Sequence, residues 1–214
     1  NDVIAIVPAG GRSRRMGDRV AAGGKAALPF GDDTMLARVC RVLLAEAGRV
    51  VVVAAKDQPL PPLPAGVEIT RDTTPDCGPL SALRDGLASA LAQGPRPAIA
   101  VLCSCDVPGL APRVVQLLIR KARASAASWI VPLVGGHPQV LVSAVTAKGF
   151  TQILSEATSL LKSPRALVEA IQAEDEEAVL FLTEAELGTV DPTLASFADV
   201  DTPDDLAKAW PSTT

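Results

Sequence analysis

Residues 50–55 constrain the fold more than any other stretch, because they are four valines and two alanines with no polar residue among them. A strand with one face in water alternates apolar and polar residues, whereas a strand of a parallel sheet is covered on both faces and is apolar throughout. Residues 3–7 and 98–103 are apolar runs of the same kind. We expect these three segments to be buried strands of one sheet.

Three segments placed between and after these runs have apolar residues at every third or fourth position, which is the spacing of one helix face. The first follows a turn and N-cap sequence at residues 31–34, the second ends at Gly94-Pro95, and the third covers residues 111–124. The recurring residues are Leu36, Val39, Val42 and Leu43, then Leu80, Leu83, Leu87 and Leu91, then Val114, Leu117 and Leu118. Strands that alternate with helices predict a three-layer α/β/α Rossmann-like fold with a mostly parallel sheet, and 214 residues suffice for one domain over residues 1–214.

The second half of the chain contains the signals of an antiparallel strand. Apolar runs at residues 129–134 and 139–145 are separated by Gly-Gly-His-Pro, a spacing suited to a hairpin, and His137 reads as a turn residue rather than a catalytic base. Helices are expected at residues 147–161 and 164–173, and a further strand at 178–182. Residues 197–201 are expected to end a strand, with Thr202 as the N-cap of a helix that starts at Pro203.

The first strand leads into a loop rich in glycine and arginine. Ala9, Gly10 and Gly11 end the strand with residues that leave backbone N–H groups uncovered for an anion. Five of the 20 Lys and Arg residues, but only one acid, lie between Arg12 and Lys25. Positive charge concentrated in this way suits a small polyanion, so the loop predicts a phosphate cradle. An ordinary glycine-rich turn with solvated arginines is the alternative.

Four aspartates follow strands of the expected sheet. Asp106 comes after residues 98–103, Asp72 after a weak strand at residues 67–70, and Asp199 and Asp201 flank Val200. Carboxyl ends of parallel strands meet along one edge, where open α/β sheets bind their ligands. Asp106, with Asp201 or Asp199, would there bind Mg²⁺ through hard oxygen ligands.

Each of these residues also has a structural explanation. Asp106 could cap the following turn, Asp72 could form an Asx-turn, and Asp199 and Asp201 could face solvent at an edge. Lys25 could be a lysine of a flexible loop. If the functional interpretation holds, Gly10, Gly11, Arg15 and Lys25 bind a triphosphate, and the whole arrangement is suited to Mg²⁺-assisted transfer of a nucleotidyl group.

Several function classes are excluded or disfavoured. Aromatic residues make up 3% of the chain, Tyr is absent and the net charge is −4, so a surface that stacks nucleic-acid bases is poorly supplied. Neither G-x-x-x-x-G-K-[ST] nor G-x-G-x-x-G is present. The four cysteines have no C-x-x-C spacing and no apolar stretch approaches membrane-spanning length, so we expect reduced thiols in a cytoplasmic protein without a membrane partner.

The motifs together resemble the nucleotidyltransferase family related to molybdenum cofactor guanylyltransferase. The segment PAGGRSRRMG with Lys25 downstream is similar to the family signature A-G-G-x-S-x-R-M-G...K. RDTTPDCGPLSAL resembles the D...GPLaG segment, SCDVP resembles C-D-x-P, GGHPQVL resembles the segment before the antiparallel strand, and FADVDTPDDL resembles N-x-N-T-P-E-x-L. The matches are collinear and cover nearly the whole chain.

The resemblance implies a Rossmann-like nucleotidyltransferase fold, Mg²⁺ as cofactor, and transfer of GMP from GTP to molybdopterin. Arg15, Lys25 and Asp106 would be catalytic, Asp106 and Asp201 would bind the metal, and Asp199 and Asp201 would lie on the acceptor side. The nucleotide-binding residues carried over are Pro8, Ala9, Gly10, Gly11, Ser13, Arg15, Lys25, Asp72, Gly78, Pro79 and Leu80. Proteins that take up the finished cofactor are the partners implied.

Three departures from the family pattern keep other functions open. Residues 18–24 delay Lys25, Ala82 or Leu83 replaces a glycine, and Asp199 and Asp201 stand where guanylyltransferases have two asparagines. Cytidylyl- and sugar-phosphate nucleotidyltransferases of the superfamily use aspartate there, so an enzyme that uses CTP or UTP is one alternative. A nucleotide-binding carrier module with weak catalysis is the other.

Overall fold

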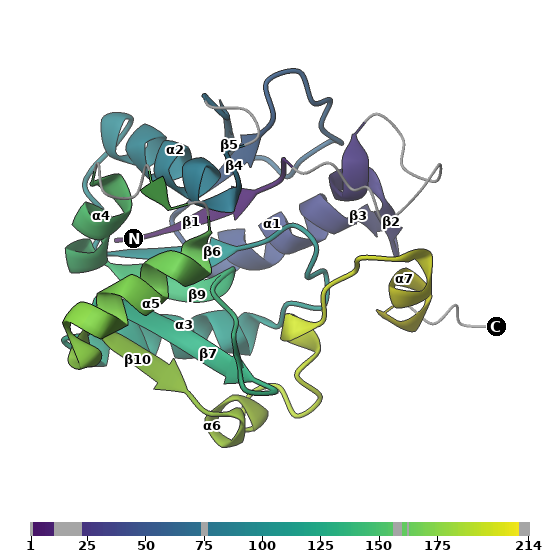
Figure 1. The fold of residues 1–214 in the computed structure, drawn as a ribbon. Helices are drawn as coiled ribbons and strands as arrows, with labels where there is room; N and C mark the ends of the chain where they lie inside the picture. The colour runs from purple at the N-terminus through teal and green to yellow at the C-terminus, as the bar shows by residue number, and fades with distance from the viewer. Residues whose placement is uncertain (1, 11–22, 74–76, 156–159, 162, 210–214) are drawn as a thin grey trace.

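A central sheet of eight strands forms the middle layer of the protein (Figure 1). The structure is a computed structural model that describes residues 2–10, 23–73, 77–155, 160–161 and 163–209. The strand order is β10-β7-β9-β6-β1-β4-β5, and β8 pairs with β7. The strands are β1 Val3–Pro8, β4 Arg49–Ala54, β5 Val67–Arg71, β6 Ile99–Cys103, β7 Trp129–Val134, β8 His137–Pro138, β9 Val142–Thr146 and β10 Val179–Leu182.

The pairing confirms a mostly parallel sheet with an antiparallel strand. β1 lies parallel to both β4 and β6, with Ala5 opposite Val50 and Val101. β5 adds in parallel to β4, and β10 adds in parallel to β7. Only β9 reverses direction on the main path, because it is antiparallel to both β6 and β7. The hairpin predicted between residues 129–134 and 139–145 forms with other bounds. Val134 pairs with His137 of β8, so the prediction of His137 as a turn residue was wrong, and Trp129 pairs with Val145 of β9.

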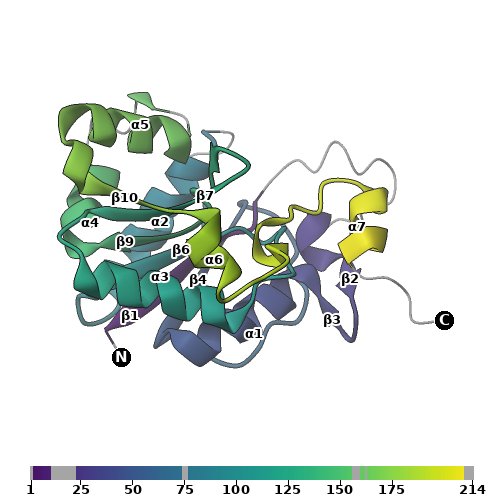
Figure 2. The ribbon, with the colours of Figure 1, turned by 90° about the horizontal axis from the view of Figure 1, so that it is seen from below.

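Helices cover both faces of the sheet, which confirms the three-layer arrangement (Figures 1 and 2). Alternate residues of β1 enter different apolar clusters: Val3, Ala5 and Val7 pack with α1 and α3, and Ile4 and Ile6 pack with α2, α4 and α5. The helices are α1 Met35–Glu46, α2 Pro79–Ala92, α3 Pro112–Ala124, α4 Ala147–Leu154, α5 Pro164–Glu174, α6 Glu184–Gly188 and α7 Pro203–Ala209.

The predicted helices begin close to where the sequence places them, whereas α6 was not predicted. Thr34 Oγ1 accepts a hydrogen bond from the backbone N–H of Ala37 at 3.3 Å, and Ser163 Oγ accepts one from Ala166 at 3.1 Å. Proline occupies the first turn of α2, α3 and α5, where the missing N–H costs nothing. Gly86 allows α2 to lie close to the sheet, since a Cβ at this residue would be 2.6 Å from Ile6 Cγ2.

Ahead of α1, a 3₁₀ helix covers Gly24–Ala27, and β2 (Pro29–Phe30) pairs with β3 (Asp33–Thr34). Two predicted boundaries were wrong. The helix predicted over residues 147–161 is α4, which ends at Leu154. Residues 197–201 do not end a strand: a 3₁₀ helix covers Ala195–Phe197, and the backbone beyond it has one hydrogen bond to the sheet edge, from Val200 N to Asp106 O at 2.8 Å.

A small third apolar cluster attaches the C-terminal segment to the first half of the chain. Val200 is buried against Leu28, Phe30 and Met35, and Leu206 of α7 packs against the same group. Figure 1 shows α7 beside β2 and β3, although about 170 residues separate them in the sequence. This contact carries the residues next to Val200 to the edge of the sheet.

Three of the four cysteines lie in the core. Cys40, Cys103 and Cys105 are buried and Cys77 is exposed, and none of the four forms a disulfide. In the part of the chain that the structure describes, every helix is too short or too polar to span a lipid bilayer.

Candidate active site

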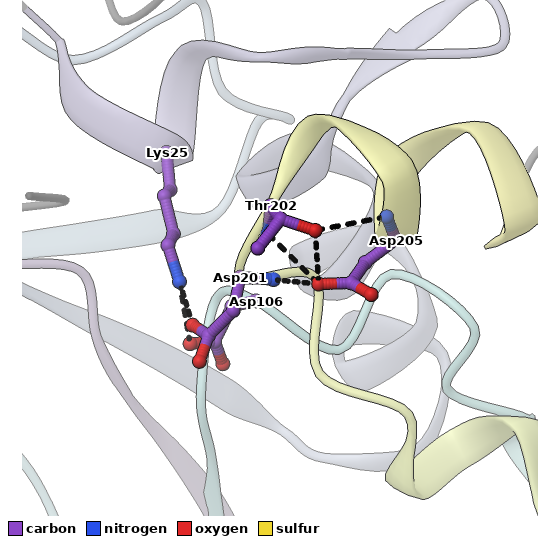
Figure 3. Close-up of polar contacts among 5 residues, drawn as sticks. All are labelled: Lys25, Asp106, Asp201, Thr202 and Asp205. Atoms are coloured by element: carbon purple, nitrogen blue, oxygen red, sulfur yellow. Dashed lines mark hydrogen bonds and ion pairs between the residues drawn. The ribbon is translucent and has the colours of Figure 1, made fainter. Parts of the chain in front are cut away.

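Lys25, Asp106 and Asp201 come together at the carboxyl edge of the sheet (Figure 3). Lys25 Nζ donates a hydrogen bond to Asp201 Oδ1 and lies 3.8 Å from Asp106 Oδ2. The three side chains are 13%, 33% and 24% exposed in the order Lys25, Asp201, Asp106, so the ion pairs are partly removed from water. The lysine therefore reaches the acidic centre despite the seven residues that delay it in the sequence.

A capping box fixes the backbone of Asp201 (Figure 3). Thr202 Oγ1 accepts a hydrogen bond from the backbone N–H of Asp205 at 3.2 Å. In return, Asp205 Oδ2 accepts hydrogen bonds from Thr202 N, Thr202 Oγ1 and Asp201 N at 2.8, 2.7 and 3.2 Å. These hydrogen bonds, those from Thr202 first, lower the pKa of Asp205. The predicted N-cap is thus confirmed, and it leaves the side chain of Asp201 to point at Lys25.

Asp199 is the third acid near this centre. Part of its side chain meets solvent, yet burial of the rest raises its pKa to about 6, with the charges of Asp106 and Asp201 acting in the same direction. Because residues 197–201 do not form the expected strand end, strand alternation does not decide where Asp199 and Asp201 point. Asp201 faces Lys25, and Asp199 lines a neighbouring pocket.

This pocket has a volume of about 250 Å³ and opens beside Asp106. Asp106 and Asp199 are its acids, and Arg165, near the start of α5, is its cation. Its remaining lining is Ser104, Val107, Pro138, Gln139, Val140, Leu141, Val142, Ser163 and Pro164. The mixture of apolar walls and a few polar groups is typical of a small-molecule site.

The glycine-rich loop begins beside the end of β4. Ala9 N donates a hydrogen bond to Val53 O at 2.8 Å, and a Cβ at Gly10 would be 3.1 Å from Ala55 N. Pro8 and Ala9 are buried and Gly10 is exposed. Gly11, Ser13 and Arg15 lie outside the described residues.

Gln58 also belongs to this region, although no sequence pattern indicates it. Its Nε2 donates hydrogen bonds to Ala9 O at 3.0 Å and to Gly23 O at 3.1 Å, and its Oε1 accepts one from Ala55 N at 3.1 Å. Ala9 and Gly23 stand on either side of residues 10–22. Gln58 therefore joins the two ends of the loop to the end of β4.

The predicted nucleoside-side residues lie around the start of α2. Asp72 N donates a hydrogen bond to Ala54 O at 2.8 Å, which places Asp72 at the carboxyl edge beside β4. Gly78 has a φ of +85°, a conformation that favours glycine, and it precedes the exposed Pro79. The side chain of Leu80 is 2% exposed and packs in the core, so its backbone is the part that can contact a ligand.

Two carboxylates that share one cation suit Mg²⁺, which binds through one or two carboxylates and keeps its other positions for water and phosphate oxygens. The ammonium of Lys25, in contact with Asp201 and close to Asp106, is a cation that both carboxylates attract. A closed cage of protein ligands is not present: among the described residues, no three His, Cys, Asp or Glu side chains form a metal-binding group.

Comparisons with known proteins identify the family of the chain. The family model described as the MobA-like NTP transferase domain matches residues 5–178. A Mycobacterium ulcerans (strain Agy99) protein named "Probable molybdenum cofactor guanylyltransferase" is 38% identical over 130 residues, which is 61% of each chain. The match thus spans about three fifths of the length of that relative.

Solved structures confirm the predicted nucleotidyltransferase fold. Molybdopterin-guanine dinucleotide biosynthesis protein A from Archaeoglobus fulgidus superimposes with a TM-score of 0.73 at 17% identity and covers 97% of both chains. Rv0371c from Mycobacterium tuberculosis H37Rv, in a complex with manganese, superimposes with a TM-score of 0.64 at 20% identity over 100% of both chains.

Proposed function

The chain belongs to the MobA-like NTP transferases, and from this premise we propose that it transfers GMP from GTP to the phosphate of molybdopterin in a Mg²⁺-dependent reaction. An acceptor phosphate oxygen attacks the α-phosphorus of GTP, a new P–O bond forms, and the bond to the bridging oxygen of the β-phosphate breaks. Both electrons of that bond leave with pyrophosphate. The protein would do this in the cytoplasm and pass the product to proteins that use the cofactor.

The observation that carries this proposal is the position of Lys25 against Asp201 and Asp106, of which Asp106 also lines the pocket. Asp106 and Asp201 would bind Mg²⁺, and the manganese complex of Rv0371c supports a divalent ion in this fold. The ion supplies positive charge to the phosphates when it is bound. Lys25 and Arg15 would bind the triphosphate, and Gly10 and Gly11 would donate backbone N–H groups.

The pocket beside Asp106 suits the second substrate. An acceptor bound between Asp199 and Arg165 would present its phosphate toward Asp106, where the α-phosphate of the nucleotide would lie. Asp201 of the C-terminal segment belongs to the same centre, so we propose that residues 1–214 act as one catalytic domain. The nucleotide's base would lie near Asp72 and the turn at Gly78, and the Gly-Pro-Leu sequence there resembles the GTP-using branch.

The experiment that tests the proposal is pyrophosphate release by the purified protein with Mg²⁺, molybdopterin and GTP, CTP or UTP in turn. GTP should support release, and Asp106→Asn should lower the rate by about 10²–10³-fold, the loss typical of one electrostatic group in an active site. Absence of pyrophosphate with molybdopterin and every nucleotide contradicts the proposal.

A second candidate function is a cytidylyl- or sugar-phosphate nucleotidyltransferase. The observation that favours it is the pair Asp199 and Asp201, in place of the two asparagines of guanylyltransferases. Release of pyrophosphate with CTP or UTP but not with GTP would select this candidate. The carrier alternative rested on the delay of Lys25 in the sequence, and the contact of Lys25 with Asp201 speaks against it.

A further inference from the structure

Lys25 contacts the carboxylates that would bind a divalent ion. Its ammonium group contacts the carboxylate of Asp201 and lies 3.8 Å from Asp106 Oδ2, and its side chain is 13% exposed. These are the two carboxylates that would bind the metal. An ammonium group and a divalent ion held by the same two carboxylates would repel each other, so each weakens the binding of the other.

We propose that Lys25 and the divalent ion compete for Asp106 and Asp201, so that the metal binds tightly only after a nucleotide has drawn Lys25 onto its phosphates. This inference rests on the proposed function and describes how the same site is regulated. Without nucleotide, the lysine neutralises the carboxylates and keeps the metal affinity low. With nucleotide, the lysine leaves and the metal takes its place.

The charges around Lys25 explain why an ion must be present in both states. Asp106 and Asp201 both lie against the ammonium of Lys25, at 3.8 Å for Asp106 and in direct contact for Asp201, at a partly buried place. Carboxylates that repel one another at a partly buried site need a neutralising cation. Lys25 supplies that charge before the substrates bind.

The backbone of Lys25 lies close to Ala9, the residue at which the glycine-rich loop begins. Gln58 bonds Gly23 to Ala9, so the chain two residues before Lys25 is next to the start of the glycine-rich loop. The long stem of a lysine can reach either side from one backbone position. A movement of the side chain alone is therefore enough to exchange carboxylates for phosphates.

The proposal has a thermodynamic consequence. If the nucleotide removes a competitor of the metal, the nucleotide tightens metal binding, and the metal must tighten nucleotide binding by the same factor. A neutral residue at position 25 removes the competitor permanently. The metal should then bind well without nucleotide.

The test is a titration with Mn²⁺, followed by the electron paramagnetic resonance of the unbound ion, with and without α,β-methylene GTP. Without the nucleotide, Lys25→Met should bind Mn²⁺ about 10-fold more tightly than the wild type, within the range of measured coupling factors. Lys25→Gln should behave in the same way, and it decides the question if Lys25→Met does not fold. Adding Asp106→Asn should abolish the gain.

Lys121→Met is the matched control. Lys121 also forms an ion pair with a carboxylate, that of Glu186 at 2.5 Å, and Glu186 is not one of the proposed metal ligands. This variant should leave the Mn²⁺ affinity unchanged. Equal Mn²⁺ affinity of the wild type and both Lys25 variants without nucleotide would overturn the inference. The Mn²⁺ titration needs neither the acceptor nor turnover. A protein that releases no pyrophosphate would contradict the proposed function, but its Mn²⁺ affinities would still decide the inference about Lys25.

Discussion

The side-chain amide of Gln58 donates a hydrogen bond to the carbonyl oxygen of Gly23 at 3.1 Å, and so connects a proline-rich segment to the end of the glycine-rich loop. The same nitrogen bonds Ala9 O at 3.0 Å. A loop that binds phosphate through backbone N–H groups is effective only if its ends are fixed. Gln58 does this with one side chain.

We predict that Gln58→Met weakens nucleotide binding more than it weakens the fold. Methionine has a similar length but cannot form the three hydrogen bonds, so the ends of the loop lose their connection. The dissociation constant for GTP should rise about 10-fold, equivalent to about 1.4 kcal/mol, which is the net value of one or two hydrogen bonds. Calorimetric titration with GTP and Mg²⁺ measures the change.

Gln116→Met is the control for Gln58→Met. Gln116 also uses its side-chain nitrogen, bonding Glu46 Oε1 at 3.0 Å, but at the opposite edge of the sheet near Val3. It should leave GTP affinity unchanged. If both variants bind GTP like the wild type, Gln58 does not position the loop.

Arg165 should affect the acceptor and not the nucleotide. It is the cation of the pocket beside Asp106, and its Nε pairs with Glu169 at 2.8 Å, which orients the guanidinium. We expect Arg165→Met to raise the KM for molybdopterin by about 10- to 100-fold, the loss of one charge-assisted hydrogen bond, with the KM for GTP unchanged. Initial rates of pyrophosphate release against each substrate separate the two constants.

Arg113→Met provides the comparison, because Arg113 also follows a proline at the start of a helix, α3, and does not line the pocket. Its kinetics should match those of the wild type. A rise in the KM for GTP in Arg165→Met would place Arg165 on the nucleotide side and contradict the assignment of the pocket.

The sheet could be predicted from the sequence because its strands leave a local pattern. Burial on both faces makes β1, β4 and β6 continuously apolar, and Thr34 and Thr202 show where helices begin. The meeting of Lys25 with Asp106 and Asp201 was predictable only in part. The edge of the sheet gathers the strand ends, but nothing local indicates that residues near position 200 pack on residues 28–35.

Two features had no usable signal. Gln58 is a single amide in a connection with four prolines, and only its position after β4 relates it to the site. Residues 198–201 alternate apolar and acidic side chains like a strand, yet Val200 is held by a hydrogen bond to Asp106 O and by apolar contacts distant in sequence. Contacts between segments so far apart decide such geometry, and periodicity does not reveal them.

The four thiols should differ in reactivity. Burial raises the pKa of Cys40 and of Cys105 to about 12, and it raises that of Cys103 as well, so these thiols seldom form the reactive thiolate. Cys77 is exposed and precedes Gly78. We expect a disulfide reagent such as Ellman's reagent to modify one thiol of the native protein rapidly and all four in guanidinium chloride.

Nucleotide binding adds a second expectation for the thiols. If the base of GTP lies near the turn at Gly78, GTP with Mg²⁺ should slow the reaction of Cys77, and Cys77→Ser should remove the rapid phase. Modification of more than one thiol in the native protein would show that the buried cysteines open readily. A rapid phase unaffected by saturating GTP would move the nucleotide away from this turn.

Val200→Ala should disturb the acidic centre through packing alone. Val200 is 1% exposed, and its contacts with Leu28, Phe30 and Met35 carry the neighbouring Asp201 to Lys25. Removing two buried methyl groups should lower the free energy of unfolding by about 1.5–2 kcal/mol. Since Asp201 is then less well placed, the affinity for Mn²⁺ in the presence of α,β-methylene GTP should fall several-fold.

Val114→Ala separates this local effect from general destabilisation. Val114 of α3 is 0% exposed and belongs to the large cluster under the sheet, so the same two methyl groups are lost with a similar cost in unfolding free energy. Urea unfolding should show comparable losses for both variants, whereas the Mn²⁺ titration should differ from the wild type only for Val200→Ala. Equal Mn²⁺ affinities in the two variants would mean that the C-terminal cluster does not position Asp201. The site would then tolerate loosening of the apolar contact that brings Asp201 to Lys25.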